Sequence, residues 1–215
     1  MGKDKLGAFI DAVYAITITI CIINIQKPES ATWAALWAVR DSIVTYVITF
    51  FMMISMWIQI HFLWHQITKI NNAVIWASIL FLFTSSFIPY ATSLIMEGGF
   101  DNRYFAIIYG ALAIIISLSL LAIQITCEKC NEETLGSGKS SKIMPSRAIM
   151  TLDIFIKLVG TLIAALVWPP LVIIAVFIAF EFNSLATRIV QKRIAKKIDA
   201  DMREDDIMNN EEECL

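Results

Sequence analysis

The sequence is poor in charged residues. Only 17% of the 215 residues are charged, whereas 58% are hydrophobic and the mean hydropathy is +0.69. A soluble domain of ordinary composition is about 25% charged and about 45–50% apolar. The scarcity of charge therefore excludes both a water-soluble globular domain and a disordered chain. It predicts an integral membrane protein that crosses the bilayer several times.

Motifs for enzyme chemistry are also missing. Four cysteines are too few for a disulfide scaffold in a chain of this size. Cys127 and Cys130 form a C-x-x-C pair, but no second pair of ligands follows at zinc-site spacing, so a structural role is favoured over a redox one. Glu133 stands where a phosphate-binding loop ending at Lys139 needs glycine, and no nucleophile elbow occurs. We expect no enzyme, no cofactor, no resident metal and no nucleic-acid partner.

Long apolar runs are what the sequence does contain, and they predict an all-α fold. Barrel strands alternate apolar and polar residues, and the run 106–116 does not alternate. Six segments have about the 20 apolar residues that a membrane-crossing helix needs: 7–26, 42–64, 73–96, 104–127, 148–168 and 170–187. Residues 1–187 are thus expected to form one six-helix transmembrane domain. Residues 188–215 are expected to add a basic helix extension and an acidic tail in the cytoplasm.

The distribution of Lys and Arg predicts the orientation of these helices. Thirteen of the seventeen basic residues lie in the two termini and in the loops after the second and fourth spans. The opposite loops carry only Lys27, Arg40 and Arg103, and Lys157 lies inside a span. Basic residues accumulate on the cytoplasmic side of a membrane protein. Both termini are therefore predicted to be cytoplasmic, in a protein of the bacterial plasma membrane surrounded by lipid.

Four Asp, Glu or Lys residues fall inside the predicted spans. Asp153 and Lys157 stand four residues apart, so one helix turn can pair them, and we favour this pairing over a proton relay. Glu181 lies near the cytoplasmic end of its span and is expected to reach the interface. Asp11 opens the first span and is expected to accept a contact from Lys5 or His61 rather than to bind ions directly.

The first span carries the most informative pattern. Its spacing puts Ile16, Thr19, Ile20 and Ile23 on one helical face. Such a face arises by chance in a helix so rich in isoleucine, so periodicity alone leaves packing and pore lining both open.

Two blocks of sequence resemble the transmembrane protein 175 family of potassium channels. The first block runs from Lys5 through Phe9, Ile10 and Asp11 to 15–19, Ala-Ile-Thr-Ile-Thr. It is similar to the family signature, in which Arg is followed by Phe-Ser-Asp and then by an apolar helix containing Ala-Ile-x-x-Thr. The chain has Lys5 in place of that Arg and Ile10 in place of that Ser.

The second block follows at a matching distance. It comprises Trp57, Ile60 and His61, with residues 71–92 after them. It resembles the Trp-x-x-His-His-x-x-Phe stretch of the family and its third span, although Ile60 stands in place of the first His. Together the two blocks cover about the first hundred residues.

The resemblance implies a function and a set of site residues. It implies a potassium-permeable cation channel whose pore is lined by the first helix. Family pore positions fall on Ile16, the hydrophobic constriction, on Thr19, a hydroxyl ring, and on Ile23, a further apolar layer. Family residues that hold the first helix against its neighbours fall on Lys5, Phe9, Asp11, Trp57 and His61. Family members with two six-span repeats pair up, so a chain with one repeat is expected to form a homotetramer.

The implied selectivity mechanism needs no backbone filter. The sequence lacks the Thr-Val-Gly-Tyr-Gly loop of carbonyl filters, so a ring of Ile16 side chains is expected to select and gate by forcing ions to shed water. Potassium is expected to pass more easily than sodium, and permeant potassium is the only ligand expected in the pore. The alternative is a small proton-coupled transporter that uses Asp11, Asp153 and His61. Interrupted helices in paired halves are typical of transporters, however, and Pro89 alone breaks a span interior.

Overall fold

The computed structural model describes residues 2–97, 102–135, 147–189 and 192, and the secondary structure of these residues is entirely helical. Seven helices are α1 (Lys3–Ile23), α2 (Trp33–Ala38), α3 (Arg40–Gln66), α4 (Asn72–Ser85), α5 (Ile88–Glu97), α6 (Arg103–Leu135) and α8 (Arg147–Leu166). A further helix, Leu171–Ile189, follows α8 and is called the last span here. Six segments are long and apolar enough to cross a membrane: α1, α3, α4 with α5, α6, α8 and the last span. The all-α, six-span prediction is confirmed.

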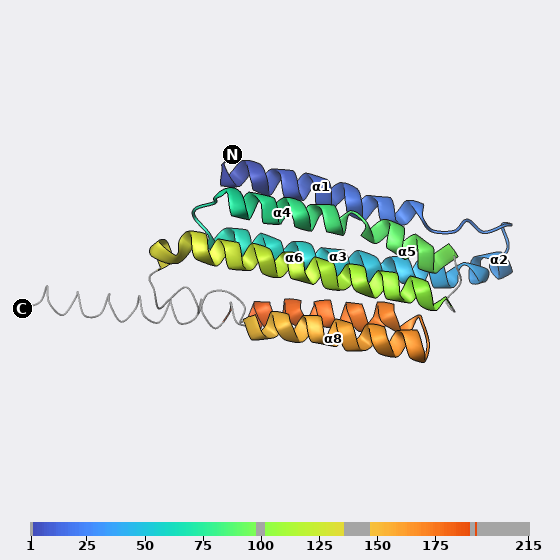
Figure 1. Ribbon diagram of the computed structural model, residues 1–215. Coiled ribbons are helices and arrows are strands. Elements are labelled where there is room, and N and C mark those ends of the chain that lie inside the picture. The colour runs from blue at the N-terminus through green and yellow to red at the C-terminus, as the bar shows by residue number, and fades with distance from the viewer. Residues whose placement is uncertain (1, 98–101, 136–146, 190–191, 193–215) are drawn as a thin grey trace, which may run out of the picture.

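The spans run side by side in a bundle of three layers (Figure 1). The pair α3 and α6 lies in the middle, with α1, α4 and α5 on one face and α8 and the last span on the other. The helix α1 packs against α3, α4 and α5, whereas α8 packs against α6. The helix α1 thus lies at the surface of the bundle, on the side away from α8.

Several boundaries differ from those expected from the sequence. The third span bends where α4 ends at Ser85 and α5 begins at Ile88, because Pro89 lacks the N–H that would continue the helix. The helix α6 continues to Leu135, although the segment after Cys127 was expected to be a loop. At a rise of about 1.5 Å per residue its 33 residues span about 50 Å, which exceeds the hydrocarbon core. The expected basic extension and acidic tail of 188–215 lie almost wholly outside the described residues.

The loop between the first two spans contains the short helix α2. Thr32 accepts a hydrogen bond from the Ala35 N–H at 3.3 Å and so caps the N-terminus of α2. The side chains of Trp33 and Trp37 are exposed. Aromatic side chains of this kind are typical of the membrane interface.

Glycines allow α8 to approach both α6 and the last span closely. A side chain at Gly110 of α6 would overlap Thr161 of α8. A Cβ atom at Gly160 of α8 would lie 2.6 Å from the Cβ of Ala175 in the last span. Small residues at these crossings let helix backbones come together, as is common in membrane bundles.

Candidate functional site

The helix α1 is attached to the bundle along one narrow stripe. Its buried residues are Leu6, Ile10, Tyr14, Thr17 and Cys21, spaced three or four apart. Only 28% of its apolar core is buried, the smallest share among the six candidate spans. Most of the circumference of α1 is therefore apolar and uncovered in the single chain.

The three residues expected to line the pore lie on this uncovered surface. Ile16 is 61% exposed, Ile23 is 77% exposed and Thr19 is also exposed. Because residues 16, 20 and 23 lie within about one third of a helical turn of each other, Ile20 belongs to the same surface. These side chains point away from the other helices of their own chain.

The hydroxyl of Thr19 has a defined orientation. Its Oγ1 donates to the carbonyl oxygen of Ile16 at 2.8 Å. A hydroxyl has one proton and two lone pairs, so this bond uses the proton and leaves oxygen available as an acceptor. The side chain can therefore present oxygen, rather than a proton, to a cation.

Asp11 joins α1 to α3 through Trp57. The indole Nε1 of Trp57 donates to Asp11 Oδ1 at 2.8 Å. The Trp57 ring stacks on the ring of His61, with centroids 5.0 Å apart and planes at 26°. The hydrogen-bond partner of Asp11 is thus Trp57, whereas the sequence suggested Lys5 or His61.

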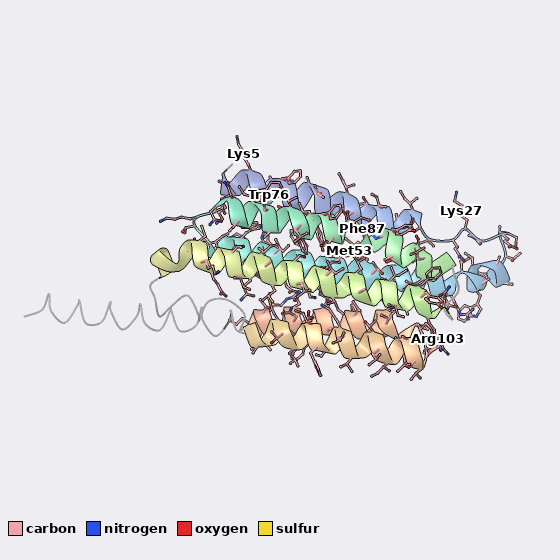
Figure 2. The ribbon with its side chains drawn as sticks, viewed as in Figure 1. Lys5, Lys27, Met53, Trp76, Phe87 and Arg103 are labelled. Atoms are coloured by element: carbon pink, nitrogen blue, oxygen red, sulfur yellow. The ribbon has the colours of Figure 1, made fainter. Side chains whose placement is uncertain are left out.

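The other two residues expected to hold α1 lie on its exposed side. The side chain of Phe9 is about half exposed and that of Lys5 is exposed. Lys5 lies at one end of the bundle, and Lys27 and Arg103 lie at the other (Figure 2). Among the described residues Lys5 makes no hydrogen bond or ion pair, and it is Lys3 Nζ that bonds the carbonyl of Ile67 at 2.6 Å.

Contacts that the sequence did not indicate hold α1 along the rest of its length. At its centre the Tyr14 ring stacks on Phe81, with centroids 5.8 Å apart, and the Tyr14 hydroxyl lies 3.3 Å from Met56 Sδ. Beyond its far end Asn24 Nδ2 donates to the carbonyl of Pro89 at 2.9 Å. Pro89 lies in the first turn of α5, so its carbonyl is close to the bend of the third span.

A single buried asparagine holds the loop between α3 and α4. Asn131 of α6 accepts from the N–H groups of Thr68 and Lys69 at 3.0 and 2.9 Å and donates to the Lys69 carbonyl at 3.0 Å. These bonds satisfy backbone groups that a short loop leaves without partners. Asn131 was missed because its partners lie more than sixty residues away.

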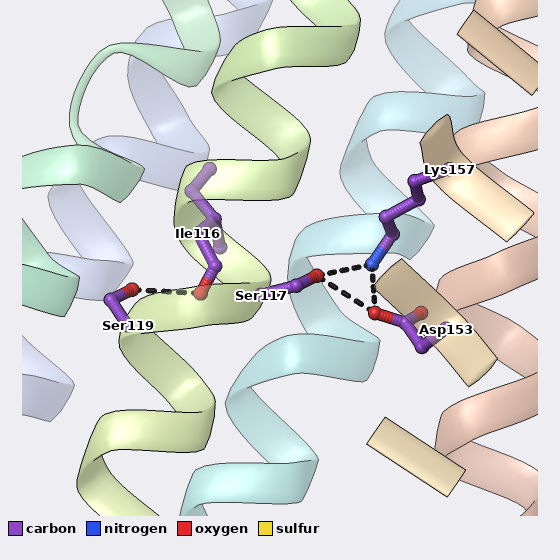
Figure 3. A network of polar contacts seen from close by, with 5 residues as sticks. All are labelled: Ile116, Ser117, Ser119, Asp153 and Lys157. Atoms are coloured by element: carbon purple, nitrogen blue, oxygen red, sulfur yellow. Dashed lines mark hydrogen bonds and ion pairs between the residues drawn. The ribbon is translucent and has the colours of Figure 1, made fainter. Parts of the chain in front are cut away.

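A buried charge pair lies in the opposite part of the bundle (Figure 3). Lys157 Nζ lies 2.6 Å from Asp153 Oδ2 and donates to Ser117 Oγ at 2.6 Å, and Ser117 donates to Asp153 Oδ2 at 2.8 Å. Lys157 Nζ also lies 3.1 Å from the centroid of the Phe180 ring. The geometry confirms the expected pairing and adds Ser117 and Phe180, which come from two other helices.

Glu181 has a partner within the bundle that the sequence did not indicate. Its side chain is partly buried and accepts a hydrogen bond from Ser55 Oγ of α3. This bond gives the carboxyl group one partner within the bundle, and the expected position of Glu181 at the interface stays a prediction.

Neither the proton-coupled transporter nor a redox role of Cys127 and Cys130 gains support from these positions. Asp11 and His61 lie on α1 and α3, whereas Asp153 lies on α8 in the other outer layer (Figure 1). Asp153 is moreover neutralised by Lys157, so the described residues do not bring the three proposed transporter groups together. Cys127 is buried and Cys130 is partly buried on α6, and both are free thiols.

Comparison with known proteins identifies the family. Residues 5–89 match the model of the endosomal/lysosomal potassium channel TMEM175. A protein from Chryseobacterium sp. (strain P1-3) that is named a potassium channel is 30% identical over 133 residues, which cover 62% of this chain and 69% of that protein. This chain belongs to the TMEM175 family. The family is one of potassium channels and not of enzymes.

Further relatives agree with the assignment to the TMEM175 family. A Streptomyces collinus protein named a potassium channel is 26% identical over 126 residues, or 57% of this chain and 61% of that protein. The crystal structure of a lysosomal potassium-selective channel TMEM175 homolog from Chamaesiphon minutus superimposes with a TM-score of 0.65. That match covers 86% of this chain and 97% of the other at 18% identity, so it shows a shared fold.

Two departures from the family pattern have a packing explanation. Ile10 and Ile60 replace a Ser and a His of the family signature, and both side chains are almost completely buried. An unpaired polar group at such a position would lose its hydration without compensation. Apolar side chains therefore suit these two positions, which lie in the hydrophobic core.

Proposed function

We propose that this chain forms a homotetrameric channel in which four copies of α1 surround a potassium-permeable pore. The proposal rests on membership of the TMEM175 family together with one observation. Ile16 and Ile23 are 61% and 77% exposed on the face of α1 that its own bundle leaves uncovered. An apolar stripe can face lipid or other copies of the same helix. Family membership favours the second arrangement.

The proposed count of four copies rests on the number of spans. The described residues hold one set of six candidate spans, whereas the resemblance implies that two-repeat members of the family form pairs. Four single repeats give the same number of first helices around the axis. Closed rotational symmetry is the usual arrangement of identical subunits.

Selectivity would arise from dehydration at the Ile16 ring. Four isoleucine side chains around an axis make a narrow apolar constriction, and an ion must lose most of its water to pass. Potassium holds its water less tightly than sodium, so its barrier is lower. The same ring would close by excluding water after a small inward movement.

Thr19 would lower the remaining barrier for the dehydrated ion. Its hydroxyl proton is used by the Ile16 carbonyl, so the oxygen lone pairs are left for the cation. One turn along the helix, Ile23 would add a second apolar layer. No cofactor is needed in this scheme, and potassium itself is the ligand.

The topology in this proposal follows the distribution of basic residues. The end of the bundle with the start of α1 and the end of α3 would face the cytoplasm, and Lys27 and Arg103 would lie at the outer surface of a bacterial plasma membrane. The resulting order along the pore from the cytoplasm outwards is Ile16, Thr19, Ile23.

Ion flux with purified protein tests this function. Liposomes containing the protein, with potassium inside and sodium outside, should develop a negative internal potential that a voltage-sensitive dye reports. Reversing the two salts should reverse its sign. A proton-coupled transporter would instead collapse an imposed pH gradient and would respond to neutralisation of Asp153. Absence of any potential in either salt gradient would refute the channel.

A further inference from the structure

Two histidines at the end of α3 face each other at the surface of the bundle. His61 and His65 are four residues apart, and their Nε2 atoms are 3.1 Å apart. Residues at this spacing lie on the same face of a helix. Neither the family signature quoted above nor the proposed pore uses His65.

Neighbouring groups hold the two rings in fixed positions. The His61 ring stacks on Trp57, and the Trp57 indole is held by Asp11 of α1 at 2.8 Å. The His65 ring meets His61 edge to face, with centroids 4.6 Å apart and planes at 78°. Since the rings are positioned before a ligand arrives, little conformational entropy is lost on binding.

The separation of the two nitrogens fits a tetrahedral metal ion. Zinc binds imidazole nitrogen at about 2.0–2.1 Å, so two ligands at a tetrahedral angle lie about 3.3 Å apart. The observed 3.1 Å differs from this value by a few tenths of an ångström. Two histidines on one helical face also supply zinc ligands in the H-x-x-x-H helices of metalloproteases. We propose that His61 and His65 form a surface binding site for one zinc(II) ion.

The surroundings determine what kind of zinc site this is. No group of three His, Cys, Asp or Glu side chains within metal-binding reach occurs among the described residues, so these residues offer two ligands and water would complete the shell. The His65 side chain is exposed and His61 is partly exposed at the end of α3, so the other described side chains leave the two rings accessible. Such a site exchanges zinc with solution and differs from a closed structural site, which has four protein ligands.

Binding would act on the contact between α3 and α1. Zinc requires a free lone pair on both Nε2 atoms, so it replaces the present hydrogen bond between the rings and keeps the last turns of α3 helical. Those turns hold His61 against Trp57, and Trp57 donates to Asp11 of α1. A ligand that binds only the folded arrangement stabilises it in proportion to the logarithm of its concentration.

Direct binding measurements test the site without reference to ion flux. Zinc is titrated calorimetrically into the purified full-length protein in detergent, in a background where Cys127, Cys130 and Cys214 are changed to Ser. The melting temperature is followed in parallel by tryptophan fluorescence. We expect one zinc ion per chain and a melting temperature that rises with zinc. His61→Gln and His65→Gln should each abolish both effects.

A matched control separates the site from adventitious binding to the acidic tail. The double variant His65→Gln/Gln66→His has the same composition and two histidines, but their spacing is five residues instead of four. It should bind no more zinc than the double variant His61→Gln/His65→Gln. Equal binding by the spacing variant and the parent, or no stoichiometric binding by the parent, would overturn the proposal. Neither result would bear on the channel itself.

Discussion

The Thr19 hydroxyl donates to the carbonyl oxygen of Ile16 at 2.8 Å, one turn back along α1. This bond ties the two expected pore residues together. It turns the lone pairs of the Thr19 oxygen away from the helix and leaves its proton satisfied. In a tetramer the four oxygens would form a ring of acceptors directly outside the Ile16 constriction.

Removing the oxygen should reduce selectivity. Thr19→Val keeps the branched shape but loses the hydroxyl, so a dehydrated potassium ion would lose its substitute ligand there. We expect a lower preference for potassium over sodium, measured as a shifted reversal potential in mixed salt. Thr19→Ser keeps the hydroxyl and should stay close to the parent. A reversal potential that is the same in the parent and in Thr19→Val would remove Thr19 from the mechanism.

A polar side chain at Ile16 should increase leak. Ile16→Asn would wet the constriction, so water and ions would pass even when the ring is narrow. Resting flux in liposomes should rise, with weaker discrimination between potassium and sodium. Ile22→Asn is the control, because Ile22 is also exposed on α1 but lies on a different side of the helix. If both variants leak equally, or if neither does, the constriction lies elsewhere.

The charge pair in the α8 layer makes a prediction about stability. Lys157→Met would leave Asp153 buried and charged without its partner, and losing one member of a buried pair costs about 3–5 kcal/mol. The double variant Lys157→Met/Asp153→Leu leaves no unpaired charge and should lose much less. Thermal unfolding in detergent compares the three proteins. A double variant that is no more stable than Lys157→Met would show that the pair is not the cause.

Local spacing was enough to predict part of this structure. Asp153 and Lys157 are four residues apart, so one helix brings them together, and the pairing was confirmed. Ser117 and Phe180, which complete the surroundings of Lys157, could not be predicted because they come from distant helices. The number of spans was predictable for a similar reason, since it depends only on the local density of apolar residues.

Contacts between helices explain where the sequence-based predictions failed. Asp11 pairs with Trp57, and which residue of α3 faces it depends on the rotation of two packed helices. The bond from Ser55 of α3 to Glu181 joins residues that are 126 apart in the chain, so the sequence did not indicate it. The roles of Ile16, Thr19 and Ile23 remain predictions, because they depend on copies of the chain around an axis.

Close packing between α8 and the last span makes a fourth prediction. Gly160→Ala would place a Cβ atom 2.6 Å from the Cβ of Ala175, so the two helices would have to separate. We expect a loss of stability of about 1–3 kcal/mol, measured by thermal unfolding in detergent. Adding Ala175→Gly removes the clashing atom and leaves the Ala175 backbone at 3.9 Å, an ordinary contact, so stability should return. No recovery in the double variant would mean that this contact does not limit helix packing.

Disulfide cross-linking between copies tests the arrangement of α1 most directly. In a background with all four native cysteines changed to Ser, Ile16→Cys and Leu162→Cys are compared in lipid vesicles at low protein density. Both parent side chains are 61% exposed in the single chain, but Ile16 is proposed to face the axis whereas Leu162 lies on α8 in the other outer layer. A disulfide needs Cα atoms within about 7 Å. We predict rapid dimer formation by Ile16→Cys and little by Leu162→Cys; cross-linking by Leu162→Cys with none by Ile16→Cys would contradict a pore lined by α1.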